Sequence, residues 1–226
     1  MNIVVTGTSR GLGFALTKEL LGREGHVILG ISRHGMPEIH ETTSRFIHIR
    51  ADLTQDEEID MAVSQIKRLV QTIDVIINNA GLLINKPFRD TTPAEIDRVM
   101  AVNFRSPTLL IQKLLPLLKP GSHIMNIGSM GGVQGTMKFP GLSVYSASKG
   151  ALTILTEALA EELKPLGIHV NCLAPGSVQT EMLSEAFPGY QASFSPEEMA
   201  IFLADFAERN YRFFNGKTLQ LAITTP

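Results

Sequence analysis

The sequence IVVTGTSRGLG, residues 3–13, indicates the fold class of this chain. Its first residues, Ile-Val-Val, are β-branched and typical of a short buried strand in a parallel sheet. A glycine-rich turn follows, and residues 14–21 are predicted to form a helix that ends near Gly22. A strand, a glycine turn and a helix form a phosphate site, because glycine permits close backbone approach and a helix N-terminus presents free N–H groups. The alternative is a tight turn without a ligand, but the position between a first strand and a helix favours the phosphate site.

The rest of the chain alternates predicted strands and helices. Glycine, proline or amide residues interrupt the chain between most of these segments. Such alternation predicts an α/β fold with a doubly wound parallel sheet of Rossmann type, in three αβα layers. We expect one domain over residues 1–226, since no repeat or linker divides the chain. Further strands are predicted at 26–31, 46–49, 74–77, 123–127, 168–174 and 217–223, and further helices at 54–70, from Thr92 onward, at 147–163 and at 195–208.

Composition excludes several classes of function. The net charge is −2 with mixed signs, so no basic surface indicates nucleic acid or an anionic membrane. No apolar run is long enough to span a membrane, and the N-terminus does not resemble a signal peptide, so we expect a cytoplasmic protein. The single cysteine, Cys172, fits a reducing compartment and is expected to be a small buried side chain. No metal site is expected.

A second motif, VYSASKG at residues 144–150, carries the candidate chemistry. Tyr145 and Lys149 are four residues apart, so on a helix their side chains share one face. A tyrosine normally titrates near pH ~10, and a neighbouring ammonium favours the phenolate. The pair is therefore one way to make tyrosine a proton donor or acceptor near neutrality. The alternative is two polar residues that face water at the start of an amphipathic helix.

The pattern Gly7-x-x-x-Gly11-x-Gly13, followed by Tyr145-x-x-x-Lys149, resembles the short-chain dehydrogenase/reductase family, in its simple one-domain form. Extended members, such as sugar-nucleotide epimerases, carry Gly-x-x-Gly-x-x-Gly and a longer C-terminal part. Each motif alone is weak, but their joint occurrence in order, each at a predicted strand end, is specific. The resemblance covers nearly the whole chain.

The resemblance implies four catalytic residues. Tyr145 would exchange a proton with the substrate oxygen, and Lys149 would lower its pKa and hold the nicotinamide ribose. Ser129, at the end of the strand 123–127, would hydrogen-bond the substrate oxygen, and Asn103 would hold a water in a proton relay. From the residues alone, Ser129 could equally belong to a turn and Asn103 could be a satisfied buried amide.

The end of the strand 26–31 decides the expected dinucleotide. An acidic residue there would bind the ribose 2′-OH of NAD, but this chain has Ser32 followed by Arg33. A guanidinium suits a 2′-phosphate, and Arg10 could approach from the glycine turn, so we expect NADP. The alternative is that Arg33 is a solvated loop residue. The candidate cofactor-binding residues are Gly7, Ser9, Arg10, Gly11, Leu12, Gly13, Ser32, Arg33, Asp52, Leu53, Asn79, Ala80, Gly81, Tyr145, Lys149, Pro175, Gly176, Val178 and Thr180.

The substrate side departs from the family pattern. Tyr145 follows Ser129 by 16 positions, a slightly longer spacing than usual, and the chain ends Thr-Thr-Pro where the family usually has Asp-Gly-Gly. Residues 181–194 have the mixed composition of a substrate lid, which we place at about 180–210. Apolar residues in this region suggest an apolar substrate pocket, and ordinary loop packing is the alternative. They are Met130, Val133, Met137, Phe139, Met182, Leu183 and Phe187.

We therefore predict an NADP-dependent oxidoreductase that interconverts a carbonyl and an alcohol on a small, apolar substrate. The alternative is a dinucleotide-binding regulator without turnover, because fold alone does not establish function. The helices from Pro93 and after Tyr145 are apolar on more than one face, and related enzymes pair these helices across a two-fold axis. We expect a homodimer or homotetramer, with deeper burial inside one chain as the alternative. The residues concerned are Ile96, Val99, Met100, Leu110, Ile111, Leu114, Leu115, Ala147, Ala151, Ile154, Leu155, Ala158 and Leu159.

Overall fold

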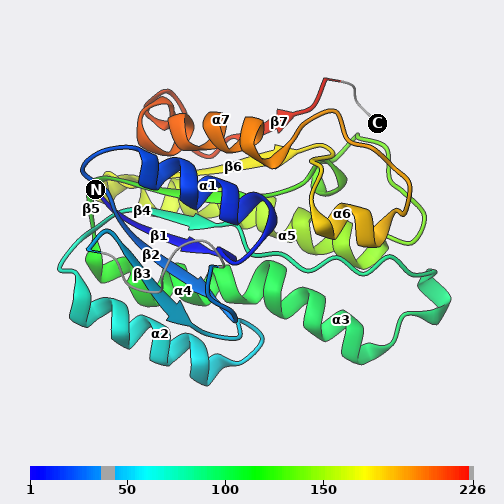
Figure 1. Cartoon of the computed structure of the whole chain (residues 1–226), viewed down its shortest axis with the longest axis horizontal. Coiled ribbons are helices and arrows are strands. Elements are labelled where there is room, and N and C mark those ends of the chain that lie inside the picture. Colours follow the sequence, from blue (N-terminus) through cyan, green and yellow to red (C-terminus); the bar gives the residue numbers. More distant parts are fainter. Residues whose placement is uncertain (37–43, 224–226) are drawn as a thin grey trace.

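The computed structural model describes residues 1–36 and 44–223, which form a seven-stranded parallel sheet between two layers of helices (Figure 1). The predicted doubly wound α/β fold is confirmed. The strands are β1 (Asn2–Thr6), β2 (Val27–Ser32), β3 (Phe46–Arg50), β4 (Ile73–Asn78), β5 (Leu118–Ile127), β6 (His169–Pro175) and β7 (Thr218–Leu221). The helices are α1 (Gly11–Gly22), α2 (Asp56–Leu69), α3 (Pro93–Met100), α4 (Ser106–Leu114), α5 (Ser143–Leu163), α6 (Glu181–Ala186) and α7 (Pro196–Glu208).

The order of the strands creates a crevice at one edge of the sheet. The order is β3-β2-β1-β4-β5-β6-β7, so the chain builds outward from β1 and then returns to its other side at β4. The loops that leave β1 and β4 diverge at such a reversal. Open α/β sheets bind ligands there, at the carboxyl ends of the strands.

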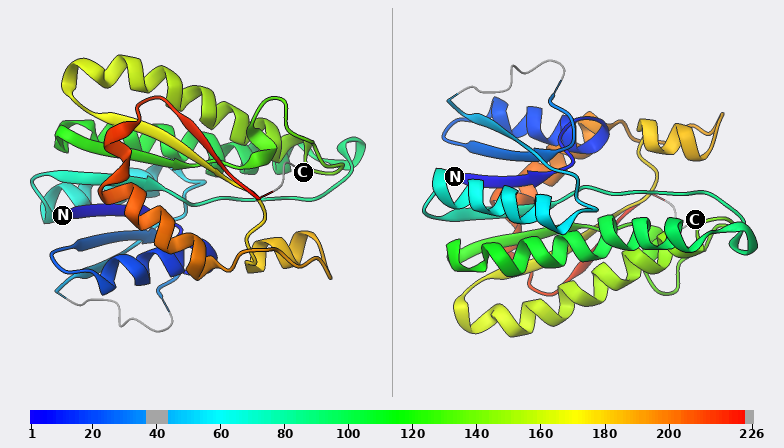
Figure 2. Two further views of the ribbon diagram at one scale, coloured as in Figure 1. Left: turned by 90° about the horizontal axis from the view of Figure 1, so that it is seen from above. Right: turned by 90° about the horizontal axis from the view of Figure 1, so that it is seen from below.

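The side chains of each strand alternate between two hydrophobic clusters. Ile3 and Val5 pack toward α1 and α7, whereas Val4 packs toward α2, α4 and α5. Figure 2 shows these two helical layers from opposite sides. An apolar stripe brings each helix to the sheet; in α2 the buried residues recur at helical spacing. They are Ile59, Ala62, Val63 and Ile66.

The long helix expected from Thr92 is interrupted by a wider turn. Thr92 caps α3 through a reciprocal pair with Glu95, as the sequence predicts. Residues 101–105 then form a π-helical turn before α4 continues. Asn103 lies in this turn, and π turns recur at functional sites because the extra residue re-aims its neighbours.

Two boundaries differ from the prediction in ways that affect the site. α5 begins at Ser143 rather than 147, so Tyr145 and Lys149 lie on the same helix. α7 does not belong to a lid: it packs against α1, and its residues Leu203 and Phe206 are fully buried in the core. The lid expected at 180–210 stays a prediction, and α7 cannot be part of it, since an element that fills the core cannot open without unfolding it.

The strands form one sheet, and we propose that the chain is a single domain on that ground. Among the described residues, no helix is both long enough and apolar enough to cross a membrane. The expectation about the C-terminal Thr-Thr-Pro concerns residues 224–226, which lie outside the described residues.

Candidate active site

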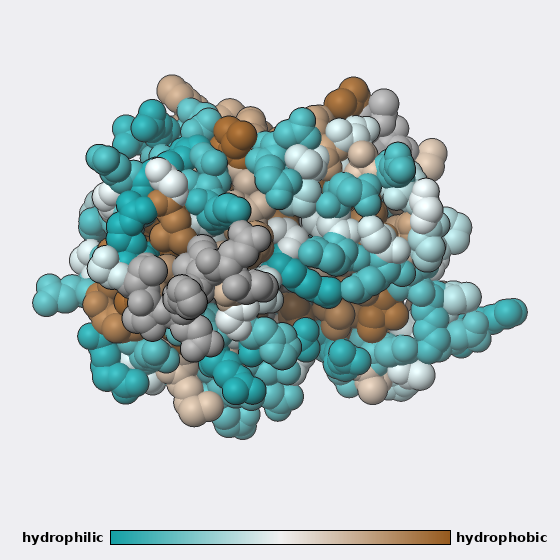
Figure 3. Space-filling view, viewed as in Figure 1, coloured by the Kyte–Doolittle hydropathy of each residue, from teal (hydrophilic) through white to brown (hydrophobic). Residues whose placement is uncertain are grey.

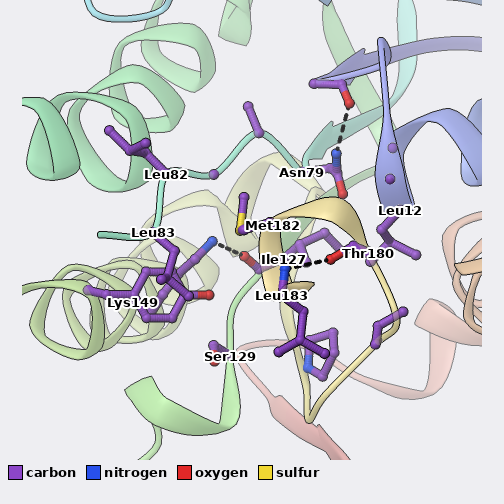
Figure 4. Close-up of a pocket in the computed structure, with 18 of the residues that line it drawn as sticks. Leu12, Asn79, Leu82, Leu83, Ile127, Ser129, Lys149, Thr180, Met182 and Leu183 are labelled. Atoms are coloured by element: carbon purple, nitrogen blue, oxygen red, sulfur yellow. Dashed lines mark hydrogen bonds between the residues drawn. The ribbon is translucent and has the colours of Figure 1, made fainter. Parts of the chain in front are cut away.

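A cavity of about 540 Å³ lies over the carboxyl ends of the strands, within the range of small-molecule sites. Every candidate cofactor-binding residue named above lines it, and so does Ser129. Asn103 does not; it is buried. Figure 4 draws Lys149, Ser129, Met182 and Leu183 among the residues that line this cavity. The tertiary structure thus brings together residues from most of the length of the chain.

The loop after β1 has the geometry of a phosphate-binding turn. Gly7 and Gly11 have φ of 76° and 56°, in the left-handed region that favours glycine. Gly13 packs so closely on the loop that a Cβ there would lie 2.1 Å from the Gly7 carbonyl oxygen and 2.3 Å from Asn79 Nδ2. Asn79 Nδ2 in turn donates to the Thr6 carbonyl at 2.9 Å, which joins the loops after β1 and β4 (Figure 4). The backbone is therefore held open at the N-terminus of α1, and an anionic phosphate fits there.

Lys149 and Tyr145 extend from the first turns of α5 toward the cavity. Lys149 is only 3% exposed, and its Nζ donates to the Ile127 carbonyl at 2.7 Å (Figure 4). Burial lowers the pKa of Lys149 to about 8. Burial raises the pKa of Tyr145 above its ordinary value, partly offset by a hydrogen bond from Ser129. The expected lowering by Lys149 is not found, because the ammonium is directed at the Ile127 carbonyl and burial dominates.

Ser129 retains its hydroxyl proton for a ligand or for Tyr145. Its Oγ accepts from the backbone N–H of Gly131 at 3.2 Å, in the short turn after β5. A hydroxyl has one proton and two acceptor positions, so this contact leaves the O–H free to donate. Ser129 can therefore hydrogen-bond an oxygen at the wall of the cavity, and it already contacts the Tyr145 phenol.

Asn103 is a buried amide whose oxygen and nitrogen both have hydrogen-bond partners. Its Oδ1 accepts from the Leu82 N–H at 2.7 Å, and its Nδ2 donates to the Leu82 carbonyl and to Ser148 Oγ, both at 2.9 Å. Ser148 donates in turn to the Tyr145 carbonyl at 2.7 Å. Asn103 thus joins the loop after β4 to α5, the helix that carries Tyr145 and Lys149. The contacts of Asn103 match the alternative of a satisfied buried amide. Its role in a water relay stays a prediction.

The adenosine side of the cavity carries several charges. Burial alone would raise the pKa of Asp52, but hydrogen bonds from Thr54 and the charges of Arg33 and Arg98 lower it. Asp52 is therefore a carboxylate that feels the positive charges of two guanidinium groups. It does not cap α2, which begins four residues later with Gln55 as N-cap. Arg98 was not predicted as a site residue. It lies one helical turn before Val102, and both residues line the cavity.

Arg10 and Thr180 meet the candidate lid. Arg10 Nη1 pairs with Glu185 of α6 at 2.8 Å, on an exposed part of the molecule. The structure thus places this guanidinium on α6, rather than toward Arg33. Thr180 Oγ1 accepts from the Leu183 N–H as the N-cap of α6, so its own proton remains free to donate (Figure 4). At the C-terminal end of α6, Asn85 Nδ2 donates to the Ala186 carbonyl at 2.8 Å.

The predicted apolar pocket is present in part. Val133 and Met137 do not line the cavity, because Thr136 bonds the Met130 and Val133 carbonyls and so folds this loop into a turn that leaves Met137 at the surface. Figure 3 shows hydrophobic residues gathered between the positions of α6 and α3. The predicted residues that do line the cavity are Met130, Phe139, Met182, Leu183 and Phe187. Apolar residues missed by the sequence analysis include Leu82, Leu83, Leu142, Phe194 and Ile223.

Comparison with known proteins identifies the family. Over residues 1–191 the sequence matches the short chain dehydrogenase family, and the chain belongs to that family. It is 35% identical over 190 residues to 2-(R)-hydroxypropyl-CoM dehydrogenase of Xanthobacter autotrophicus, covering 79% of this chain and 75% of the relative. The chain is therefore an oxidoreductase of a family that uses NAD or NADP.

Two solved structures show the same fold with different dinucleotides. A short chain dehydrogenase from Burkholderia cenocepacia J2315, in complex with NADP, has a TM-score of 0.82 at 27% identity, covering 97% of this chain and 95% of that one. A 3-ketoacyl-(acyl-carrier-protein) reductase from Brucella melitensis, complexed with NADH, has a TM-score of 0.83 at 25% identity, with the same coverage. Relatives of this similarity thus include both dinucleotides.

Proposed function

We propose that this chain is an NADP-dependent oxidoreductase that interconverts a carbonyl and an alcohol on a small, apolar, uncharged substrate. The observation that carries the proposal is the convergence of Ser129, Tyr145 and Lys149 on the same cavity as the glycine turn after β1. A proton donor and a dinucleotide site are both needed for carbonyl reduction, and this cavity offers residues suited to each.

The preference for NADP rests on the residues of this chain, since relatives bind either dinucleotide. The residue at the end of β2 is Ser32 rather than an acid, and Arg33 beside it lines the cavity. An acidic side chain would repel a 2′-phosphate, whereas a guanidinium attracts it and can bond it in a bidentate way. The buried ammonium of Lys149 is suited to hydroxyl oxygens of the nicotinamide ribose.

The catalytic roles follow from the protonation states at the site. Tyr145 is a neutral phenol at neutral pH because burial raises its pKa, which is the form that a proton donor needs. Ser129 would turn its hydroxyl proton from Tyr145 to the substrate oxygen and stabilise the charge that develops there. Lys149, with a pKa of about 8, carries most of its positive charge near neutrality, which suits it to hold the nicotinamide ribose. Bound NADPH would supply the hydride to the carbonyl carbon.

The polarity of the cavity supports an uncharged substrate. The described cationic residues that line it are Arg10, Arg33, Arg98 and Lys149. Arg33 and Arg98 lie after β2 and on α3, away from α6 and the loop before α5, and Arg10 reaches α6 but is already paired with Glu185. A substrate carboxylate or sulfonate beside Ser129 would therefore lack a cation of its own, and its desolvation would oppose binding. We propose that residues 180–194 cover this apolar part as a lid.

The test measures loss of NADPH absorbance with a panel of aldehydes, ketones and quinones. Tyr145→Phe should lower kcat by at least about two orders of magnitude, because it removes only the proton donor. NADPH binding, followed by fluorescence, should persist. Tyr211→Phe is the matched control, since Tyr211 lies outside the cavity and bonds the Gly121 carbonyl. Near-normal turnover of Tyr145→Phe would exclude the assigned role, and NADPH binding without turnover in the wild type would favour the regulator.

A further inference from the structure

A buried hydrogen-bond network lies beneath the proposed 2′-phosphate site. Ser32 Oγ is 2.7 Å from the His34 carbonyl, 3.1 Å from Thr8 Oγ1 and 3.1 Å from His48 Nε2. His48 Nε2 is also 3.2 Å from the Ser32 carbonyl oxygen. Thr8 is fully buried and Ser32 is 6% exposed, so these polar groups depend on one another rather than on solvent.

Counting protons assigns each bond. The Ser32 hydroxyl has one proton, which it donates to the His34 carbonyl at the shortest distance. Ser32 Oγ must then accept from both Thr8 and His48, which fills its two acceptor positions. His48 accordingly carries a proton on Nε2, since both atoms that face this nitrogen, Ser32 Oγ and the Ser32 carbonyl oxygen, are acceptors.

The saturated hydroxyl has a consequence for cofactor recognition. Ser32 was expected to bind the cofactor, but its side chain has no donor left for a phosphate oxygen. Its bond to the His34 carbonyl instead spans Arg33, so it constrains the backbone on both sides of that residue. Thr8 ties the same hydroxyl to the glycine turn, and His48 ties it to β3.

The room for this network depends on Gly30. A Cβ at Gly30 would lie 3.1 Å from Thr8 Oγ1 and 2.7 Å from the ring of Phe46. Gly30 lies on β2, the strand that ends at Ser32, and pairs in register with His48 of β3. The loop after β1, the end of β2 and the middle of β3 are thus joined through side chains next to Arg33, which lines the cavity.

We propose that Thr8, Ser32 and His48 are positioning residues that aim Arg33 at the 2′-phosphate, and that Ser32 does not bind the phosphate through its hydroxyl. The proposal rests on the proposed NADP preference. In this proposal His48, which does not touch the cofactor, helps to discriminate between the two dinucleotides. It does so by fixing the backbone that carries Arg33. A residue that only supported the fold would affect both dinucleotides equally.

The test compares binding of 2′,5′-ADP, which carries the 2′-phosphate, with 5′-AMP, which lacks it, by titration calorimetry. His48→Phe and Thr8→Val should each weaken 2′,5′-ADP about five- to tenfold, the usual effect of one lost hydrogen bond, and change 5′-AMP less than about twofold. His48→Gln, which can present an N–H, should restore most of the preference. His34→Ala is the control, because it keeps the carbonyl that Ser32 bonds. NADPH and NADH binding should follow the same pattern.

Three results would overturn the proposal, and they are distinguishable. If Ser32→Ala alone weakens 2′,5′-ADP while His48→Phe and Thr8→Val do not, Ser32 is a direct ligand. If the variants weaken both nucleotides equally, the network is only structural. If the wild type binds 2′,5′-ADP no better than 5′-AMP, the NADP preference itself fails and the positioning role falls with it.

Discussion

At the scale of single residues, burial changes what a motif can do. Tyr145 and Lys149 have the spacing of a proton-donor pair, yet the phenol has a raised pKa and the ammonium a lowered one. Both shifts have the same cause, since a low-dielectric surrounding disfavours the charged form of either group. The two pKa values therefore lie further apart than those of the free side chains, so near neutrality Tyr145 keeps its proton and Lys149 is the group closer to titration.

Arg33 should read the 2′-phosphate. We expect Arg33→Ala to weaken NADPH by about 1–3 kcal/mol, because a charge-assisted hydrogen bond is lost, and to leave NADH little changed. Fluorescence titration with both dinucleotides measures this. Equal weakening of both would show that Arg33 does not contact the phosphate.

His123 should make the fold sensitive to acid. Burial lowers its pKa to about 3, helped by the charge of His169 and opposed by a bond to the Ala207 carbonyl. Between about pH 6.5 and about pH 3, His123 binds a proton in the unfolded chain but not in the folded chain. The free energy of unfolding therefore decreases as the pH falls through this range. The loss from this residue could reach about 4 kcal/mol.

Urea unfolding at pH 7.5 and pH 4.5 measures this effect. The free energy of unfolding should fall less between these pH values in His123→Gln than in the wild type, while His34→Gln, at an exposed histidine, should follow the wild type. An equal acid loss in His123→Gln and the wild type would contradict the assignment.

At the scale of elements, α6 and α7 differ in how they pack, although the sequence placed both in one lid. α6 and α7 were expected to share a lid, but α7 buries a face against α1, whereas α6 has no buried residue. Contacts to both sides hold α6: Glu185 to Arg10 and Ala186 to Asn85. An exposed ion pair and one hydrogen bond are weak compared with core packing, so α6 is the segment that can move.

The junction of β1 and α1 should tolerate no side chain at Gly13. Gly13→Ala places a Cβ 2.1 Å from the Gly7 carbonyl oxygen, so the turn must shift and dinucleotide binding should fall at least about tenfold. Gly22→Ala, at the end of the same helix, meets nothing within 4 Å and should leave binding unchanged. Calorimetric titration with NADPH and thermal unfolding compare them; normal binding by Gly13→Ala would show that the turn does not form the phosphate site.

At the scale of the whole molecule, the surface of α5 bears on assembly. Of the residues expected at a two-fold interface, Val99, Leu110, Ile111 and Leu114 are buried within the chain, as the alternative held. Ile154 is 64% exposed, however, with Ala147 and Ala158 exposed on the same helix. We retain the proposal that a second copy of this chain covers this face, since an exposed isoleucine among small residues permits close helix packing.

Ile154→Arg should dissociate that assembly. A closed two-fold interface receives the new charge twice, so the substitution should shift the mass from dimer or tetramer to monomer in light scattering at micromolar concentration. Met61→Arg, at an exposed apolar residue of α2, should leave the mass unchanged. A wild-type monomer under these conditions would reject the proposal.

The sequence by itself determined the βα alternation, the glycine turn and the Tyr145/Lys149 pair, because these depend on local periodicity and on residues a few positions apart. Only the tertiary structure decided which side chains meet and which of their protons are free. The π turn at Asn103, the burial of α7, the placement of Arg10 on Glu185 and the saturation of the Ser32 hydroxyl by Thr8 and His48 all depend on contacts between distant segments. Burial and hydrogen-bond satisfaction are properties of the packed chain, so local pattern carries no direct record of them.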